Sequence, residues 1–364
     1  MSTLLNIFKN EKLKLPLVYK NGGSDIIQLL QDTFLELSDE IGKPENYLIV
    51  RRGNFDKINS YSAKIITTVN YWFQGHISEA RKTFDTHLKQ NLLQLPQRKV
   101  LADGIFYRVR TSEEHKILDR KSLFHIPFNL RNKVSTQRFS IPGFPCLYLG
   151  NSTYICWEEL NRPQFHDIQA AKLKNTKEIS LCNLSYEQYD LQKLDPAKIT
   201  DDEAIKLLLA YPIIAACSIQ VPQNRQFDPF KAEYIIPQIV LQTLMEEKDT
   251  GTIGVVYAST KIHRNKSESK GSFENFVLPT TSAVRPSGYC TNLTGLFDMT
   301  SAVAGWPVDF VSSYPTKSAS VSFAVEKLDL DGIVVPYGIT QFALLEKALG
   351  EKTPRPIELD FQKD

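Results

Sequence analysis

The chain has almost no excess of charge of either sign. Its 364 residues include 43 Lys and Arg against 41 Asp and Glu, which gives a formal net charge of +2. A protein that holds nucleic acid or an anionic membrane through its overall field needs a much larger basic excess. We therefore expect no nucleic-acid partner and no membrane partner, and any anion-binding site must be local.

The chain is also poor in cysteine, and its five cysteines form no CxxC pair. Widely spaced single cysteines argue against a zinc site and against a disulfide framework, and they suit a reducing compartment. We expect small buried core residues, no metal and a cytoplasmic location. The five cysteines are Cys146, Cys156, Cys182, Cys217 and Cys290.

A long apolar run is missing as well. The opening MSTLLNIFKNEKLKLPL lacks the continuous apolar stretch of a signal peptide, so we expect no export. The most apolar segment, Leu207 to Ile219, is too short to span a bilayer and contains Pro212. We interpret it as buried core.

Several catalytic signatures are absent, and each absence removes a class of enzyme. The sequence contains no GxGxxG after a strand pattern, no GxxxxGK[ST], no HExxH, no GxSxG and no EF-hand loop. The common dinucleotide, P-loop, zinc-protease and serine-hydrolase scaffolds therefore lose support. The histidines are scattered without the spacing of metal ligands.

The first hundred residues have helical patterns. SDIIQLLQDTFLELSDEI repeats its apolar residues near a helical period behind Ser24 as a candidate N-cap. A second helical pattern, 63–95, breaks at Gly75 and resumes, which indicates a helical hairpin. Proline, charge and glycine in 94–104 mark a boundary. We predict a helical N-terminal domain over 1–100.

Beyond this boundary the pattern changes to short β-branched or aromatic runs bounded by turn residues, with helical segments between them. This alternation predicts a mixed α+β domain over 101–364. The strand-like runs are 104–110, 145–150, 177–185, 251–259 and 331–338, and the helical segments are 153–162, 201–217 and 232–248.

A chain-ordered set of polar residues falls at the ends of these predicted strands and on one helix. Taken singly, each has an ordinary structural explanation, such as a surface ion pair, a core tyrosine, a solvated helix face or a turn. Their order around one presumed cleft favours a site. The residues are Arg108 in FYRVR, Arg138 in QRFSIPG, Tyr148 in LYLG, Glu158 and Glu159 in CWEEL, and Ser259 in VYASTK.

This set resembles the RES domain family, which is named for its Arg, Glu and Ser. The family pattern has an arginine on an early strand and another before an SPG turn. A tyrosine on the next strand, a glutamate on the following helix and a later serine that closes a strand complete it. Those places are taken here by Arg108, Arg138, Tyr148, Glu159 and Ser259, and the resemblance covers most of 101–280.

Two departures from the family pattern stand out. The usual small residues before the glutamate are replaced by ICWEE, which leaves the choice between Glu158 and Glu159 open, although the spacing from Tyr148 fits Glu159. The insert 261–274, KIHRNKSESKGSFE, lengthens a usually short segment after Ser259. Its charged part is most simply a solvated loop, with a lid or an inhibitor contact as the alternative.

The resemblance implies an ADP-ribosyltransferase-like fold and an enzyme that degrades NAD, often as the toxin of a toxin and antitoxin pair. NAD is then the substrate, and an antitoxin or inhibitor protein and a second copy of the chain are possible partners. The expected activity is that of an NAD glycohydrolase acting in the cytoplasm.

The residue types suit this chemistry on physical grounds. Arginine binds phosphate oxygens through two parallel hydrogen bonds, so Arg108 and Arg138 suit the pyrophosphate. Cleavage at the nicotinamide ribose passes through an oxocarbenium-like sugar, which a carboxylate such as Glu159 stabilises. Nicotinamide departs neutral, so no general acid is required. Tyr148 can stack on the nicotinamide or ribose, and Ser259 can bond the carboxamide or position the glutamate.

Two alternatives remain open at this point. The same site could transfer ADP-ribose to a protein or small molecule, because the acceptor depends on what fits beside the ribose. A non-catalytic protein that senses NAD or docks a partner through its helical domain belongs to another class. The helical extension could also act as a restraint, a dimer interface or a sensor.

Overall fold

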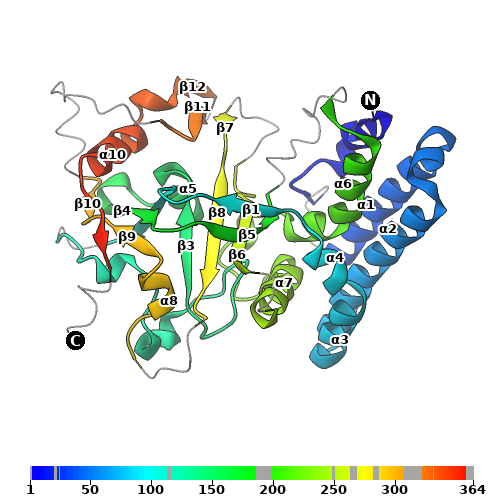
Figure 1. Ribbon diagram of the computed structural model, residues 1–364, viewed down its shortest axis with the longest axis horizontal. Coiled ribbons are helices and arrows are strands. Elements are labelled where there is room, and N and C mark those ends of the chain that lie inside the picture. Colours follow the sequence, from blue (N-terminus) through cyan, green and yellow to red (C-terminus); the bar gives the residue numbers. More distant parts are fainter. Residues whose placement is uncertain are drawn as a thin grey trace. The chain divides into compact units, whose positions relative to one another are not determined.

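The computed structural model describes residues 2–19, 23, 25–112, 116–185, 198–247, 251–262, 269–281, 287–306, 322–330 and 332–357. The chain forms two compact units, which we call the helical unit and the sheet unit (Figure 1). The helical unit contains Met1–Pro96, Thr136–Ile141 and Asn183–Thr250. The sheet unit contains Gln97–Ser135, Pro142–Cys182 and Gly251–Asp364.

The chain passes between the units more than once. The first passage, after Pro96, lies beside the boundary expected near residue 100. The later return of Asn183–Thr250 to the helical unit means that the division into 1–100 and 101–364 describes only that first passage. The returning segment carries α6 (Asp201–Cys217) and α7 (Ile235–Glu246), which are buried on most sides and therefore need other elements packed around them.

The helical unit is built around α6. This helix begins with a capping box, in which Thr200 and Glu203 bond each other's backbone amides, and it contacts α2 and α7. Tyr211 of α6 donates from its hydroxyl to the carbonyl of Leu13 (2.7 Å). The other elements of the unit are η1 (Thr3–Lys9), η2 (Glu11–Leu13), α1 (Ile26–Gly42), α2 (Pro44–Phe73), α3 (Ile77–His87), α4 (Lys89–Leu93), η7 (Gln223–Arg225) and η8 (Ala232–Tyr234).

The N-terminal helical prediction is confirmed in its main features. The helix expected over 24–41 is α1, and the expected break at Gly75 separates α2 from α3, with Gly75 at a φ of +76°. The N-cap of α1 is Asp25, whose side chain accepts from the amides of Ile27 and Gln28. Ser24, the expected cap, lies outside the described residues.

Within its described residues, the sheet unit contains a ten-stranded sheet and a smaller three-stranded one, so the mixed α+β class is confirmed. The large sheet has the order β1-β5-β6-β8-β3-β2-β4-β9-β13, with β10 beside β4. Its strands are β1 (Gln97–Val100), β2 (Ile105–Thr111), β3 (Cys146–Gly150), β4 (Ile168–Asn175), β5 (Ile179–Leu184), β6 (Thr252–Ala258), β8 (Glu274–Pro279), β9 (Phe297–Met299), β10 (Val303–Ala304) and β13 (Arg355–Pro356).

The small sheet and the helices of this unit complete the architecture. The order in the small sheet is β12-β11-β7. These elements are β7 (Lys270–Gly271), β11 (Val325–Leu330), β12 (Ile333–Pro336), α5 (Thr153–Glu159), α8 (Thr291–Thr294), α10 (Gln341–Gly350), η3 (Lys121–Leu123), η4 (Phe128–Lys133), η5 (Phe165–Asp167) and η10 (Tyr337–Ile339).

Strand alternation separates two cores in the sheet unit. Phe106 of β2 and Leu147 of β3 belong to a large apolar cluster that also includes Phe276 of β8. Tyr107 and Val109 point the other way and belong to a second cluster with residues of α5 and α10. α5 therefore covers the face opposite the large cluster.

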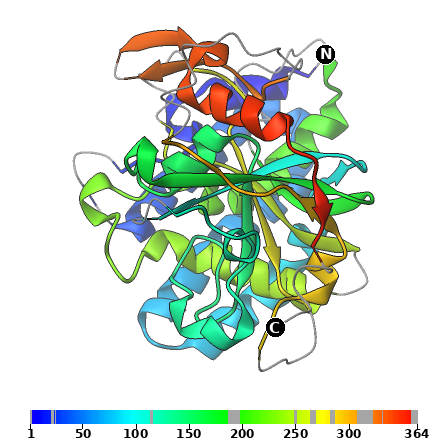
Figure 2. The same cartoon turned by 90° about the vertical axis from the view of Figure 1, so that its left-hand side faces the viewer.

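The large sheet changes direction between β2 and β3. These strands share one residue pair, Tyr107 with Gly150, whereas β2 pairs with β4 along its whole length and β3 does so with β8. In Figures 1 and 2, β3 and β8 run upright while β4 runs across them. The single residue pair between β2 and β3 thus divides the sheet into two parts, and we call this place the joint of the sheet. The helix α5 follows β3 directly in the chain.

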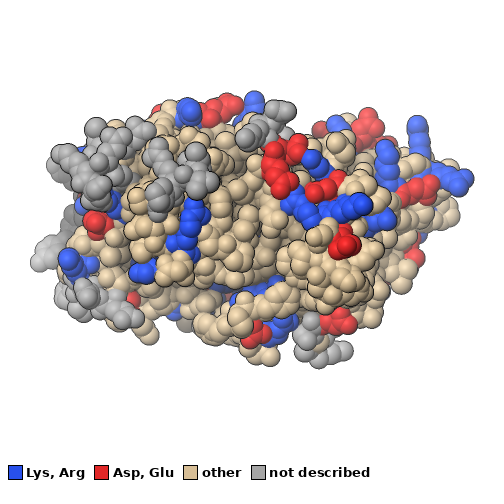
Figure 3. All heavy atoms as spheres, turned by 90° about the horizontal axis from the view of Figure 1, so that it is seen from below, with Lys and Arg blue, Asp and Glu red and all other residues tan. Residues whose placement is uncertain are grey.

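In the view of Figure 3, basic and acidic side chains lie near one another in the most charged part, and neither sign covers a broad area. This agrees with the near-neutral net charge. Among the helices of the described ranges, none combines the length and the apolar character that crossing a membrane requires.

Candidate functional site

Glu159 is the carboxylate at which three elements of the sheet unit meet. It is the last residue of α5, and its side chain is 31% exposed. Its Oε1 accepts hydrogen bonds from the Ser259 hydroxyl and from the Asn275 amide Nδ2, each at 2.8 Å. The Lys261 ammonium lies 3.7 Å from Oε2. One carboxylate oxygen is therefore held by two neutral donors while the other faces a cation.

The strand order brings the two neutral donors together. Ser259 follows the end of β6 and is 2% exposed, and its amide donates to the carbonyl of Phe273 (2.9 Å). Asn275 lies on β8, where it pairs with Tyr257 of β6 and Gly150 of β3. The order β6-β8-β3 therefore presents the serine and the asparagine to the helix that follows β3.

Close packing places α5 on the end of β3. A Cβ added to Gly150 would lie 2.8 Å from the Cys156 sulfur and 3.1 Å from the Ser152 carbonyl, so only glycine fits here. The Ser152 hydroxyl caps the helix by accepting from the amide of Ile155. The helix ends where Asn161 adopts a φ of 63°, which leaves Glu159 at its C-terminus.

A buried carboxyl also anchors the start of α5. Glu346 of α10 is 1% exposed, and its Oε1 accepts from the Thr153 amide (2.7 Å), the Thr153 hydroxyl (3.0 Å) and the Tyr337 hydroxyl (2.6 Å). Burial raises the pKa of Glu346 from 4.5 to about 7, although these hydrogen bonds oppose the shift.

The raised pKa of Glu346 predicts that the free energy of unfolding depends on pH. A carboxyl whose pKa is higher in the folded chain stabilises it fully below the unfolded pKa of 4.5, and this contribution is lost as pH rises through about 7. The unfolding free energy of the wild type relative to Glu346→Gln is expected to fall by about 3 kcal/mol between about pH 4.5 and pH 8. Urea denaturation at several pH values measures this, with Glu351→Gln as an exposed control; parallel curves for wild type and Glu346→Gln would contradict it.

Glu158, the neighbouring candidate, is not joined to Ser259. It is 2% exposed, and its Oε2 pairs with the Arg162 Nε at 2.9 Å. Its Oε1 has no hydrogen-bond partner within the described residues. Arg162 in turn lies over the ring of Trp157, 5.7 Å from its centroid. Between the two glutamates left open by the sequence, the structure brings Glu159 to the serine.

Tyr148 lies at the middle of β3, opposite Val277 of β8. It shares a face of the strand with Gly150, so its side chain projects on the side that α5 covers. Burial raises the pKa of the Tyr148 hydroxyl well above its usual value, which keeps the hydroxyl neutral.

Arg108 lies on β2 at the joint of the sheet, where β2 meets β3, and by strand alternation its side chain projects from the same face as Phe106, opposite the face that α5 covers. Its Nη1 donates to the carbonyl of Tyr148 (2.7 Å), while its buried Nε has no hydrogen-bond partner among the residues that the structure describes. Burial lowers the pKa of Arg108 to about 10, and no carboxylate pairs with it in the described ranges. A partly buried guanidinium without an acidic partner is costly, and a bound anion would offset that cost.

Arg138 belongs to the helical unit, in the segment Thr136–Ile141. Its amino groups donate to the carbonyls of Cys217 (3.2 Å) and Ile219 (2.9 Å), and the guanidinium lies 5.1 Å from the centroid of the Tyr234 ring. These contacts hold a 7% exposed side chain within its own unit. The expected alignment of Arg138 with the Tyr148 strand concerns both units and stays a prediction.

Sequence reasoning missed Asn275 and Lys261, although both contact Glu159. The available signal was the polar pair Glu274 and Asn275 in the otherwise apolar run FENFVLP. Lys261 is the first residue of the insert 261–274, whose charged part is expected to form a solvated loop, a lid or an inhibitor contact. Residues 263–268 of this insert lie outside the described residues, so the expected role of the insert is untested.

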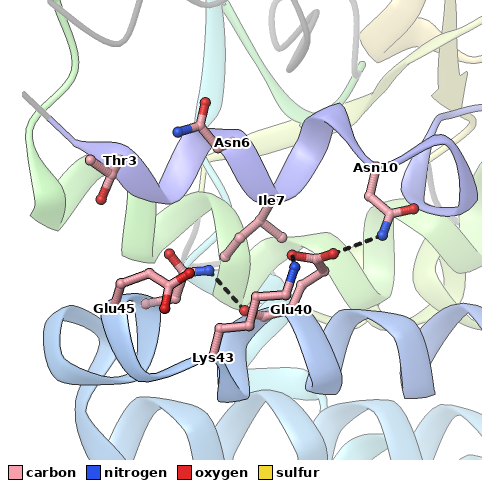
Figure 4. Close-up of a pocket in the computed structure, with 8 residues that line it drawn as sticks. Thr3, Asn6, Ile7, Asn10, Glu40, Lys43 and Glu45 are labelled. Carbon is pink, nitrogen blue, oxygen red and sulfur yellow. Dashed lines mark hydrogen bonds and ion pairs between the residues drawn. The ribbon is translucent and has the colours of Figure 1, made fainter.

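A separate pocket in the helical unit is polar but already paired internally (Figure 4). The Glu40 carboxylate accepts from Asn10 (2.9 Å) and pairs with Lys43 (2.6 Å), and the Glu40 carbonyl accepts from Asn46 (2.8 Å). The contacts join Asn10, which follows η1, to the last turn of α1, and that turn to the start of α2. We assign this pocket a structural role.

The cysteines are all free and buried, which confirms their interpretation as core residues. Within the described ranges, no group of three or more His, Cys, Asp and Glu side chains is placed to hold a metal ion.

No family model matches the chain, and no solved structure does. The chain is 31% identical over 311 residues to a protein of Bacillus subtilis (strain 168) named "Putative toxin YopC". The match covers 81% of this chain and 69% of the relative. At this identity and coverage, the chain belongs to the same family as this Bacillus subtilis protein.

Proposed function

We propose that the protein cleaves the bond between nicotinamide and ribose in NAD, on a sheet unit of the ADP-ribosyltransferase-like class. The observation that carries this proposal is the Glu159 carboxylate, fixed through one oxygen by Ser259 and Asn275 and partly exposed. A fixed carboxylate beside a ribose stabilises the positive charge that develops at its C1′ atom.

The proposed reaction consumes one water. The bond between C1′ and the pyridinium nitrogen breaks, and its electron pair goes to the nitrogen, so nicotinamide leaves neutral. The sugar becomes an oxocarbenium-like cation that the Glu159 carboxylate faces. A water oxygen then bonds to C1′ and releases a proton, which gives ADP-ribose, nicotinamide and H⁺.

Arg108 is the proposed anchor for the NAD pyrophosphate. Its guanidinium lacks an acidic partner in the described ranges and retains an unbonded Nε, so a phosphate oxygen would satisfy both its charge and its donor. Tyr148, adjacent to Arg108 through its carbonyl, is proposed to stack on the nicotinamide or ribose. Arg138 remains a second proposed phosphate contact.

The name of the Bacillus subtilis relative, "Putative toxin YopC", supports a toxin-type role. We propose that the protein acts in the cytoplasm, where it depletes NAD, and that an antitoxin or inhibitor protein restrains it. Induced expression tests this role: the wild type is expected to lower cellular NAD and stop growth, and Glu159→Gln is expected to do neither.

Product analysis distinguishes the proposed hydrolysis from its alternatives. Purified protein with NAD labelled in the adenosine is expected to give labelled ADP-ribose and an equal amount of nicotinamide. Nicotinamide with label attached to protein would instead identify an ADP-ribosyltransferase. Saturable NAD binding without consumption would identify a binding protein and would contradict the proposal.

A further inference from the structure

Lys261 joins the segment after Ser259 to the C-terminal end of α5. Its ammonium donates to the carbonyl of Glu159 (2.7 Å), the carbonyl of Glu158 (3.2 Å) and the side-chain oxygen of Asn161 (2.7 Å). A lysine ammonium has three N–H donors, and these contacts use all three. The side chain is 25% exposed, so much of this interaction is shielded from water.

The carbonyls that accept from Lys261 lie at the C-terminal end of α5, where a cation is favourable. The last carbonyls of a helix lack intrahelical partners and carry the negative end of its dipole, so a cation there is favourable. α5 is only seven residues long, and it ends at the left-handed Asn161. Because a short helix is not stable alone, the location of its last residue depends on such tertiary contacts.

The same lysine is tied to the serine. The Lys261 amide donates to the Ser259 hydroxyl oxygen (3.3 Å), and that hydroxyl donates to Glu159 (2.8 Å). A closed set of contacts thus runs from the Ser259 hydroxyl to the Glu159 carboxylate, along the end of α5, and back through the Lys261 side chain. Removal of the ammonium opens this set and frees the end of the helix.

We infer that Lys261 is a positioning residue, which clamps the end of α5 against the segment after β6 and so fixes the Glu159 carboxylate beside the substrate. This inference rests on the proposed function for its catalytic consequence. The clamp itself is independent of the reaction.

The test compares Lys261→Met with Lys261→Arg and with Lys270→Met. Lys270 lies on β7 of the same unit, has a 66% exposed side chain and pairs with Glu326, so it serves as the matched surface control. Lys261→Met is expected to lower kcat for nicotinamide release about 10- to 100-fold with KM within about threefold, because a small misplacement of a reacting group has an effect of this size. Lys261→Arg, which still donates to the carbonyls, is expected to recover most of that loss.

Hydrogen exchange gives a second readout that needs no catalysis. Amide exchange in a peptide covering 154–164 is expected to be faster in Lys261→Met than in the wild type and in Lys270→Met. Unchanged exchange, or an unchanged kcat per folded molecule, would overturn the inference. If the wild type releases no nicotinamide, the proposed function fails, while the exchange measurement still decides whether Lys261 is the clamp.

Discussion

Glu159→Gln is expected to reduce nicotinamide release on the order of 10³-fold while leaving NAD affinity within about threefold. The glutamine has the shape of the glutamate, and its amide oxygen can still accept from Ser259 and Asn275. What is lost is the negative charge that stabilises the oxocarbenium-like sugar, and this charge matters in the transition state rather than in substrate binding. Steady-state release and equilibrium NAD binding measure the two effects separately.

Glu158→Gln is the matched control, because it makes the same change one residue earlier. Glu158 is buried and pairs with Arg162, so its substitution is expected to lower the unfolding free energy by about 1–3 kcal/mol. The rate of nicotinamide release per folded molecule is expected to stay within about threefold of the wild type. Inactive Glu158→Gln together with active Glu159→Gln would assign the reaction to the other carboxylate.

Arg108→Met is expected to raise the KM for NAD about 10²-fold without a large loss of stability. The proposed phosphate contact disappears, while a partly buried charge without an acidic partner in the described ranges is replaced by a side chain that suits an apolar site. The unfolding free energy is expected to fall by less than about 1 kcal/mol, or to rise. Initial rates over a range of NAD concentrations and urea denaturation measure the two quantities.

Arg98→Met supplies the contrast within the same sheet. Arg98 pairs through both amino groups with the carboxylate of Glu274, whose side chain is 5% exposed. Its removal leaves a buried carboxylate unpaired, so we expect a loss of about 3 kcal/mol in stability and little change in KM. If Arg108→Met behaves like Arg98→Met, Arg108 is a structural arginine and the pyrophosphate assignment is wrong.

Local periodicity was sufficient to predict most elements, because each is specified by its own segment. The run over 24–41 forms α1, GIFYRVR contains β2, and PCLYLG contains β3. The membership of α6 and α7 in the helical unit could not be predicted in this way. Membership in a unit depends on which apolar surfaces meet in three dimensions. The order of elements along the chain instead suggests that α6 and α7 pack with the strands that precede and follow them.

The site was predictable only in part, because local sequence patterns do not show which distant residues meet in the fold. Adjacent residues on a helix point about 100° apart, so the sequence CWEEL alone does not decide which glutamate meets Ser259. The spacing from Tyr148 selected Glu159 through the family resemblance, and the structure places that residue against the serine. Asn275 and Lys261 reach Glu159 across sequence distances of about a hundred residues, and no local pattern indicates such a contact.

The most direct test of the central claim is the time course of nicotinamide release from NAD by the purified full-length wild type and by Glu159→Gln. The two proteins are first matched for folding by circular dichroism and thermal unfolding. The account predicts release by the wild type, with ADP-ribose in equal amount, and essentially none by Glu159→Gln. Equal release by both proteins would show that Glu159 is not the catalytic carboxylate, and no release by folded wild type would contradict NAD cleavage by this chain.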